Sequence, residues 1–212
     1  MTPKETRNKQ LGERLVKKLE QRHYEAYYCP TAQEAVEKAL SLIEENSTIT
    51  WGGSMTIRDA GLIKALYEAG KYKLLDRETL TDRAEIMEMY RQAFYADVYL
   101  TSANAMSEEG EIVNIDGNGN RVAAITFGPK KVIFMIGLNK VCGTLEAAIT
   151  RARSTAAPIN AARFDINTPC HTDGCCHDCH SPQCICNYIH VMRNSYPALR
   201  HTVILIGEEA GY

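Results

Sequence analysis

The chain has 212 residues, enough for one substantial core, and its composition of 45% hydrophobic and 24% charged residues is that of an ordinary globular protein. A formal net charge of −2 argues against a nucleic-acid partner, because nucleic-acid-binding domains carry a basic excess. The N-terminus is polar, without a signal peptide's apolar stretch, and apolar runs such as Val132 to Leu138 are too short to span a membrane. We therefore expect a cytoplasmic protein, in which disulfides seldom persist.

The first predicted element is an amphipathic helix from about Glu5 to Arg22. Its apolar residues recur at helical spacing among charged ones, and they are Leu11, Leu15, Val16 and Leu19. We expect this N-terminal arm, residues 1–23, to pack on the body of the protein or on a second subunit of a homo-oligomer. A tyrosine-rich strand, His23 to Cys29, follows, and Pro30 stops it.

Short strands and helices then alternate along the chain, which is typical of βαβ units. The predicted helices are Thr31–Glu45, Ile57–Ala69, Asp82–Tyr95 and Leu145–Ala156, the last one stopped by Pro158. The predicted strands are Thr48–Trp51, Lys73–Leu75, Val98–Thr101, Lys131–Gly137 and Thr202–Ile206. A hairpin around Glu108 to Ile115 interrupts the pattern. The pattern predicts one α/β domain over residues 1–212, with a mainly parallel sheet flanked by helices.

Ligands of open α/β sheets bind beyond the carboxyl ends of the strands, so the residues after each strand are the first candidates for a site. Gly52, Gly53, Ser54, Met55 and Thr56 follow one strand directly. Glycines let backbone N–H groups approach an anion, and the two hydroxyls add donors, so this segment is suited to bind phosphate or carboxylate. The alternative is a tight strand-to-helix turn in which Thr56 caps the helix.

A second candidate begins at Asn104, after the strand that ends at Thr101, and continues in a loop rich in glycine and amide side chains. The loop residues are Asp116, Gly117, Asn118, Gly119, Asn120 and Arg121. Such a loop can direct several N–H groups inward, and Arg121 is a fixed cation that suits an anion. The alternative is a surface turn. A third candidate is Lys140, which follows the strand ending at Gly137, although a lysine in that place is often merely solvated.

The densest motif is a Cys-rich stretch, residues 168–187, which holds six of the eight cysteines and lies before the last strand. Soft thiolate ligands at such short spacing favour a metal. The most economical ligand set is Cys170, Cys176, Cys179 and Cys186, with Cys175 and Cys184 left over. Turn-forming residues predict a loop rather than a helix or strand. An iron–sulfur cluster is favoured over structural zinc, and metal-free thiols are the third alternative; His171, His177 or His180 as a ligand would favour zinc.

Several of these motifs together resemble the LUD-domain proteins, the lactate-utilisation group. The resemblance covers residues from about Leu11 to Ile206 and is carried by GGSMTIRDAGL, by Ala96 to Val141 and by the cysteine tail. It implies a fold of the NagB/RpiA/CoA-transferase-like type, in which a Gly/Ser/Thr loop grips phosphate or carboxylate. It also implies a link to the oxidation of lactate, in a complex whose other subunits carry iron–sulfur clusters. The cysteine tail resembles that of a subgroup of the family.

The leading hypothesis is therefore a redox or organic-acid-utilisation protein that binds a small anionic metabolite and holds a cysteine-ligated metal centre. Its partners would be iron–sulfur oxidoreductase subunits, with no nucleic acid and no membrane. One alternative is a non-redox isomerase or acyl/CoA transferase acting on a sugar phosphate or carboxylate, with Asp116 as the candidate catalytic base. Another alternative is a regulatory or scaffold subunit without turnover.

Overall fold

The computed structural model describes all 212 residues, and its centre is a six-stranded sheet in the order β1-β10-β7-β4-β2-β3. Every neighbouring pair in this sheet is parallel, which confirms the predicted fold class. The strands, in sheet order, are β1 (Glu25–Cys29), β10 (His201–Ile206), β7 (Lys131–Gly137), β4 (Val98–Thr101), β2 (Thr48–Trp51) and β3 (Lys73–Leu75). Because all six run in one direction, their carboxyl ends lie at one edge of the sheet.

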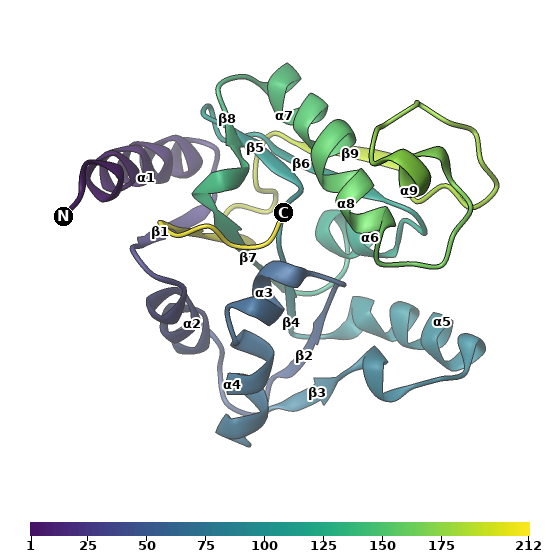
Figure 1. Cartoon of the computed structure of the whole chain (residues 1–212). Helices are drawn as coiled ribbons and strands as arrows, with labels where there is room; N and C mark the ends of the chain where they lie inside the picture. The colour runs from purple at the N-terminus through teal and green to yellow at the C-terminus, as the bar shows by residue number, and fades with distance from the viewer.

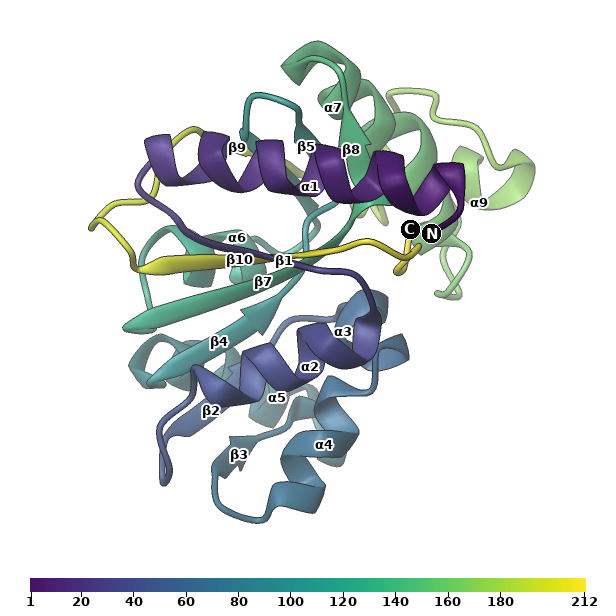
Figure 2. The ribbon, with the colours of Figure 1, turned by 90° about the vertical axis from the view of Figure 1, so that its left-hand side faces the viewer.

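Helices and a second sheet cover the two faces of the main sheet (Figures 1 and 2). Helices α2 (Ala32–Ser41), α3 (Met55–Asp59) and α4 (Leu62–Ala69) pack on one face. Helix α1 (Pro3–Gln21) and the second sheet pack on the other face. The second sheet has the order β8-β5-β6-β9, with bounds β8 Val141–Cys142, β5 Ala105–Ser107, β6 Ile112–Asp116 and β9 Tyr188–Met192. Helices α5 (Arg83–Gln92), α6 (Asn120–Thr126) and α7 (Leu145–Arg151) flank the sheets.

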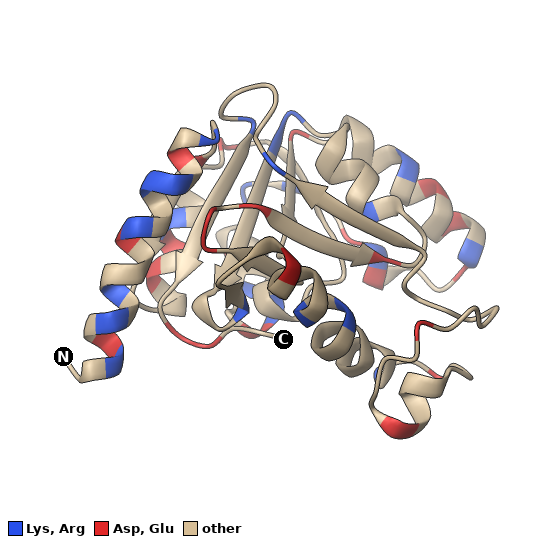
Figure 3. Cartoon of the chain, turned by 90° about the horizontal axis from the view of Figure 1, so that it is seen from above, with Lys and Arg blue, Asp and Glu red and all other residues tan.

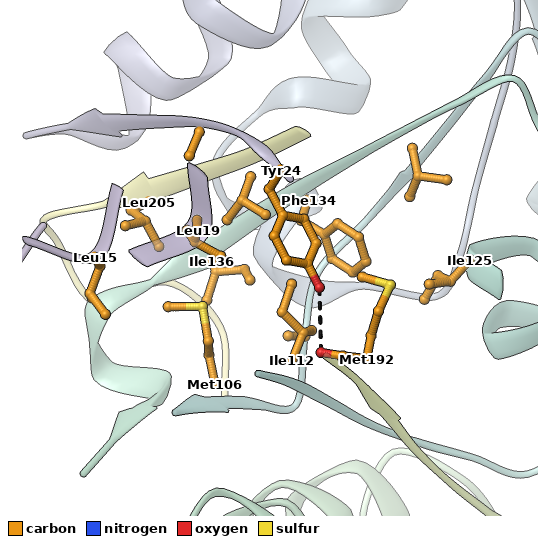
Figure 4. Close-up of a cluster of buried hydrophobic side chains, with 14 of the residues drawn as sticks. Leu15, Leu19, Tyr24, Met106, Ile112, Ile125, Phe134, Ile136, Met192 and Leu205 are labelled. Atoms are coloured by element: carbon orange, nitrogen blue, oxygen red, sulfur yellow. Dashed lines mark hydrogen bonds between the residues drawn. The ribbon is translucent and has the colours of Figure 1, made fainter. Parts of the chain in front are cut away.

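The two faces of strand β7 separate two hydrophobic cores. Val132, Phe134 and Ile136 point into the core beneath α1, whereas Ile133 and Met135 point into the core beneath α2 and α4. This alternation follows from the two-residue period of a strand that is buried on both sides. Figure 4 shows the first core, where the Tyr24 hydroxyl donates a hydrogen bond of 3.4 Å to the backbone carbonyl of Met192. The burial of these apolar side chains stabilises the main sheet, and with it the carboxyl edge of the sheet that carries the candidate site.

Helix α1 packs on the body of the same chain. Leu11, Leu15 and Leu19 are buried in the core beneath it, while acidic and basic bands alternate along its outer face (Figure 3). Two of its basic side chains, Arg14 and Lys18, pair with the acidic turn between β5 and β6. No helix of the chain combines the length and the apolar character that a membrane span requires.

The predicted helix Ile57–Ala69 is broken into α3 and α4. Gly61 adopts a left-handed conformation with φ of 85°, which ends one helix and begins the next. The prediction that Pro158 stops the helix after Leu145 was also wrong. A π-helical turn, Ala152–Ala156, follows α7, and the chain continues as α8 (Ala157–Ala161) with the proline in its first turn. The π-helical turn just before the proline interrupts the i→i−4 hydrogen-bond pattern, which accommodates the missing N–H.

Two further segments differ from the sequence-based expectation. The second half of the glycine-rich loop is helical, because α6 begins at Asn120. The Cys-rich stretch, expected to be loop throughout, contains the one-turn helix α9 (Pro169–Asp173), and it leads into edge strand β9 before β10. Strand β9 pairs antiparallel with β6, so the stretch returns to the second sheet and not directly to the main one.

Candidate functional site

An open cleft of about 730 Å³ lies beyond the carboxyl ends of β2, β4 and β7, which are neighbours in the main sheet. The structure brings most of the predicted substrate-binding residues together in its wall. They are Gly53, Ser54, Met55, Thr56, Asn104, Asp116, Gly117, Asn118, Asn120, Arg121 and Lys140. Two predicted residues, Gly52 and Gly119, do not line the cleft. The cleft therefore joins segments that are far apart in the sequence.

The two glycines after β2 make room for arginine side chains. A Cβ at Gly52 would lie 2.9 Å from Cδ of Arg121 and 2.9 Å from the Tyr99 hydroxyl. A Cβ at Gly53 would collide with the guanidinium of Arg77. Any larger residue would therefore displace the cationic groups that surround the loop, which explains the glycine pair in terms of packing.

The hydroxyls of the same loop are engaged by protein groups. The Ser54 hydroxyl accepts the Ile57 N–H at 3.5 Å and caps α3. The cap is thus Ser54, and the alternative in which Thr56 caps the helix was wrong in its choice of residue. The Thr56 hydroxyl instead donates to the backbone carbonyl of Ala210 at 3.2 Å and accepts from Lys140 at 2.7 Å. Thr56 thereby ties the C-terminal segment to the floor of the cleft.

Lys140 is buried at that floor, with only 3% of its surface exposed, so the solvated alternative was wrong. Its ammonium also donates to the Ser102 hydroxyl and to the Ala103 carbonyl, each at 3.2 Å. No carboxylate lies within 4.0 Å of the nitrogen, since Lys140 takes part in none of the chain's ion pairs. Burial, followed by repulsion from the guanidinium groups of Arg151 and Arg121, lowers the pKa of Lys140 to about 7.

The Arg121 guanidinium is held by protein oxygens. It donates to the side-chain oxygens of Asn114 at 2.5 Å and Asn104 at 3.0 Å, and to the backbone carbonyls of Ile115 and Ser102. Four acceptors account for the hydrogens of its two terminal nitrogens. Arg121 therefore orients Asn104 and contributes positive charge to the cleft, while the donors of its two terminal nitrogens are already used.

The Asp116 carboxylate caps helix α6. It accepts the backbone N–H groups of Gly119 at 3.3 Å, Arg121 at 3.0 Å and Val122 at 3.1 Å. A carboxylate at a helix start satisfies backbone N–H groups that lack a partner within the helix. The geometry thus gives the predicted catalytic base a structural task, and it leaves Lys140 as the better-placed base in the cleft.

Sequence reasoning missed several cleft residues. Arg77, Arg83, Tyr90, Arg163 and Tyr212 line the cleft from segments outside the predicted motifs. The Arg77 guanidinium donates to the Tyr90 hydroxyl at 2.5 Å, which links the segment after β3 to α5. Arg77 alone could have been found, because it follows β3 at the same edge of the sheet.

The Cys-rich stretch encloses a second, smaller cavity of about 70 Å³. All four predicted ligands line it, together with Cys184 and His177. Cys175 is exposed and lies outside it, as do His171 and His180. Burial, reinforced by the nearby thiols of Cys184, Cys170 and Cys176, raises the pKa of Cys186 to about 12. The thiols therefore gather around one space, although no three His, Cys, Asp or Glu side chains stand at the spacing of a metal-ligand group.

The two cavities share a wall. Ile115, Cys184 and Ile185 line both the large cleft and the thiol cavity. In Figure 1 helix α9 of the Cys-rich stretch lies beside α8. A group bound by the thiols would thus lie next to a ligand in the cleft.

The family model for the LUD domain matches residues 12–206, which is nearly the whole chain. The chain belongs to the LUD-domain family. This membership supports a function related to lactate utilisation at the level of the family. No curated protein matches the chain.

Among solved structures, this LUD-domain protein is similar to a DUF162 family protein from Deinococcus radiodurans, with 13% identity, a TM-score of 0.55 and coverage of 94% of this chain and 97% of the other. At that identity the likeness shows the fold. Ribose 5-phosphate isomerase A from Neisseria gonorrhoeae has 21% identity and a TM-score of 0.36, with coverage of 54% of each chain. The translation initiation factor eIF-2B from Pyrococcus horikoshii OT3 has 16% identity and a TM-score of 0.38, with coverage of 55% and 49%.

Proposed function

We propose that this LUD-domain protein binds a small carboxylate or phosphate metabolite in the strand-end cleft and holds a cysteine-ligated redox centre in the adjoining cavity. The metabolite would be an organic acid of lactate-related metabolism. The observation that carries the proposal is Lys140, a buried cation at the floor of the cleft with no carboxylate in ion-pair contact.

The charge balance of the cleft supports an anionic ligand. Burying an ammonium group without a carboxylate is unfavourable, and a bound anion would supply the missing charge. Three protein acceptors surround the Lys140 nitrogen, which suits the protonated form, while the burial and neighbouring arginines oppose it. The cleft as a whole is lined by five basic and two acidic side chains, namely Arg77, Arg83, Arg121, Lys140, Arg163, Asp116 and Asp165.

The thiol cavity supports an iron–sulfur centre more than a single zinc ion. One water-sized sphere occupies roughly 10–15 Å³, and the cavity of about 70 Å³ has room for several atoms among its thiols. Its walls are partly apolar, with Ile115, Ala157, Pro158 and Ile185. Cys170, Cys176, Cys179 and Cys186 would hold the centre, which would supply one-electron transfer.

Electron transfer needs a partner, and we propose iron–sulfur oxidoreductase subunits in that role. The exposed position of the Cys-rich stretch supports this proposal, because none of the residues from Pro169 to Asn187 is buried. A partner subunit could therefore approach the thiol cavity from outside while the metabolite occupies the cleft on its other side.

The anion site is tested by calorimetric titration with lactate, pyruvate and inorganic phosphate. We expect Lys140→Met to weaken the anion that binds best by about 30- to 100-fold, the effect of removing one partner of a buried charge pair. The matched control is Lys130→Met, a surface lysine paired with Asp97, which should bind as the unmodified protein does. Binding should also weaken as pH rises through about 7, because Lys140 then loses its proton. Equal affinity in both variants would contradict the site.

The metal centre is tested by elemental analysis and visible absorption of protein purified without oxygen. A brown protein containing iron and sulfide is the expected result. A colourless protein with one zinc ion would show that the metal centre is structural and takes no part in redox chemistry. Protein that takes up neither iron nor zinc would contradict a metal role for the thiols.

A second function is favoured by the same lysine. An amine whose pKa lies near 7 can act as a general base, so a non-redox isomerase on this fold would use Lys140 in place of Asp116. Such an enzyme would exchange a carbon-bound hydrogen of a sugar phosphate or carboxylate with solvent. Exchange followed by NMR in D₂O, lost in Lys140→Met and independent of the metal, would support this function over the redox one.

A further inference from the structure

The glycine-rich loop of the cleft and the end of the Cys-rich stretch are in direct contact. We call residues 116–120 the glycine loop and residues 184–188 the clamp segment. The clamp segment carries two cysteines of the thiol cavity and leads into β9. Strand β9 pairs with β6, and Tyr188 of β9 lies opposite Asp116 of β6. One short piece of chain thus belongs to the wall of the thiol cavity and touches the anion cleft.

Asn187 bridges the two segments through its side-chain amide. Its Nδ2 donates to the backbone carbonyl of Gly117 at 3.0 Å and to the backbone carbonyl of Cys184 at 3.1 Å. The two hydrogens of one amide nitrogen account for both bonds. Asn187 therefore fixes the glycine loop relative to the cysteine that lines both cavities.

Backbone packing reinforces this bridge. A Cβ at Gly117 would lie 3.3 Å from Cα of Ile185, so the two backbones are in close contact. Gly119 packs in the same way on the ring of Tyr188, at 3.1 Å for a Cβ built there. A displacement of the clamp segment would therefore displace the glycine loop, because no flexible side chain lies between Gly117 and Ile185.

The stretch that ends in the clamp segment has little to hold it except its ends. None of the residues from Pro169 to Asn187 is buried, and its own ties are exposed polar contacts such as those of His177 with Asp173 and of Arg153 with Asp178. Of its side chains only Cys186 packs against a buried apolar cluster, and a segment with few buried apolar contacts has low local stability. A metal that draws its thiols together would order it.

We propose that Asn187 is a positioning residue that couples the two sites, so that a metal held by the thiols strengthens anion binding in the cleft. The inference rests on the proposed function, since it needs both ligands. The coupling is reciprocal by linkage, and a bound anion strengthens metal binding by the same factor. Its physical content is pre-organisation: the metal orders the clamp segment, and the clamp segment holds the glycine loop in the shape that binds the anion.

The test compares anion affinity in two states of the full chain: protein purified without oxygen with its metal, and the same protein stripped by a chelator. Metal content is measured in each sample, and the titrant is pyruvate or inorganic phosphate. We expect the unmodified protein to bind about tenfold tighter with metal than without, within the usual range of coupling between sites. In Asn187→Ala, which lacks the amide, we expect the ratio of the two affinities to fall to about one, with metal content retained.

Two further variants keep the test decisive. Asn187→Asp preserves the shape but removes the donor, so it should lose the coupling as the alanine variant does. Gln10→Ala, a change to an exposed amide on α1, is the control and should keep the full ratio.

The outcomes distinguish a failure of the proposed function from a failure of the coupling between the two sites. Unmodified protein that binds neither metal nor anion overturns the proposed function and this inference with it. Protein that binds both, with the same anion affinity in the loaded and stripped states, overturns the coupling alone. A ratio in Asn187→Ala equal to that of the unmodified protein overturns the role of Asn187.

Discussion

The strand-end cleft and the thiol cavity share a wall, yet they are held in opposite ways. Thr56, Ser102, Ala103 and Lys140 of the cleft are all at most 5% exposed, and they follow strands that separate two hydrophobic cores. The Cys-rich stretch has no buried residue between Pro169 and Asn187. The cleft floor is therefore formed by the same burial that forms the fold. The cysteine-bearing wall of the thiol cavity has few buried contacts, so its order depends more on polar contacts and on what its sulfurs bind.

Substitutions in the two regions should therefore differ in their effect on stability. A change in the cleft floor alters the stability of the whole domain, because the floor is continuous with the sheet. A change in the thiols alters the local order of one stretch and leaves the sheet intact.

The largest effect is expected from Cys176→Ser combined with Cys179→Ser. The double variant should lose nearly all bound metal, because oxygen replaces two thiolate ligands. Its unfolding free energy without metal should stay within about 0.5 kcal/mol of that of the stripped protein, as for surface substitutions. Elemental analysis and urea unfolding measure the two quantities. Cys142→Ser, in β8 and outside the cavity, is the control that keeps its metal. A collapse of the sheet in the double variant would show that the stretch is part of the core.

The next effect in size is the pH dependence of stability that comes from His201, a buried residue of the main sheet. It is 2% exposed on β10, and its ring contacts the Ser195 hydroxyl and the Ile125 carbonyl, each at 2.9 Å. Burial is the main cause that lowers its pKa to about 4, and Arg200 adds to it. Between pH 6.5 and 4 the unfolded chain binds the proton and the folded one does not, so stability falls as pH decreases.

The loss assigned to His201 over this window is about 3 kcal/mol, because one pKa unit corresponds to about 1.4 kcal/mol. Urea unfolding from pH 7.5 to 4.5 should show a steeper decline in the unmodified protein than in His201→Gln. Parallel declines would contradict the buried neutral histidine. The thiol stretch should not influence this difference, so the metal-stripped protein is the sample of choice.

Lys140 should lower the unfolding free energy of the protein while it strengthens the binding of an anion in the cleft. Its pKa is lowered from 10.5 to about 7, so the unfolded chain holds the proton more tightly and stability rises with pH from about 7 toward 10.5. Lys140→Met should therefore be more stable than the unmodified protein at pH 6 without anion, by about 2 kcal/mol, as for other buried charges replaced by apolar groups. Thermal and urea unfolding measure this, with Lys130→Met as the neutral control. A less stable Lys140→Met would mean that its three hydrogen bonds outweigh its burial.

The smallest effect is expected from Asp116→Asn, at the junction of the two regions. The amide keeps one acceptor for the N–H groups at the start of α6 but loses the charge, which should cost about 1 kcal/mol of stability. Anion affinity should change by less than about threefold, and in the tighter direction, because one negative charge leaves the cleft. Calorimetry and urea unfolding decide this. A tenfold loss of turnover on any substrate, with binding kept, would restore Asp116 as the catalytic base.

The order and type of the main elements could be predicted from the sequence, and so could the edge at which the site lies. Apolar runs such as Lys131–Gly137 identify buried strands by themselves, and parallel strands place their following residues together. Arg163 could not be predicted as a cleft residue, because it follows helix α8 and not a strand of the main sheet. The helix that passes Pro158 was also unpredictable, since the π-helical turn before it is not visible in local propensity.

What the sequence by itself determined is the local chemistry: the thiol spacing of the Cys-rich stretch, the glycines after β2, and the strand that carries Lys140 toward the carboxyl edge. Only the tertiary structure decided how these groups act. It buried Lys140 without an ion-pair partner, occupied the terminal donors of Arg121, gave Asp116 a helix to cap and set Asn187 between the two cavities. The physical reason is that burial and hydrogen-bond partners arise between segments far apart in the chain, and no local pattern records them.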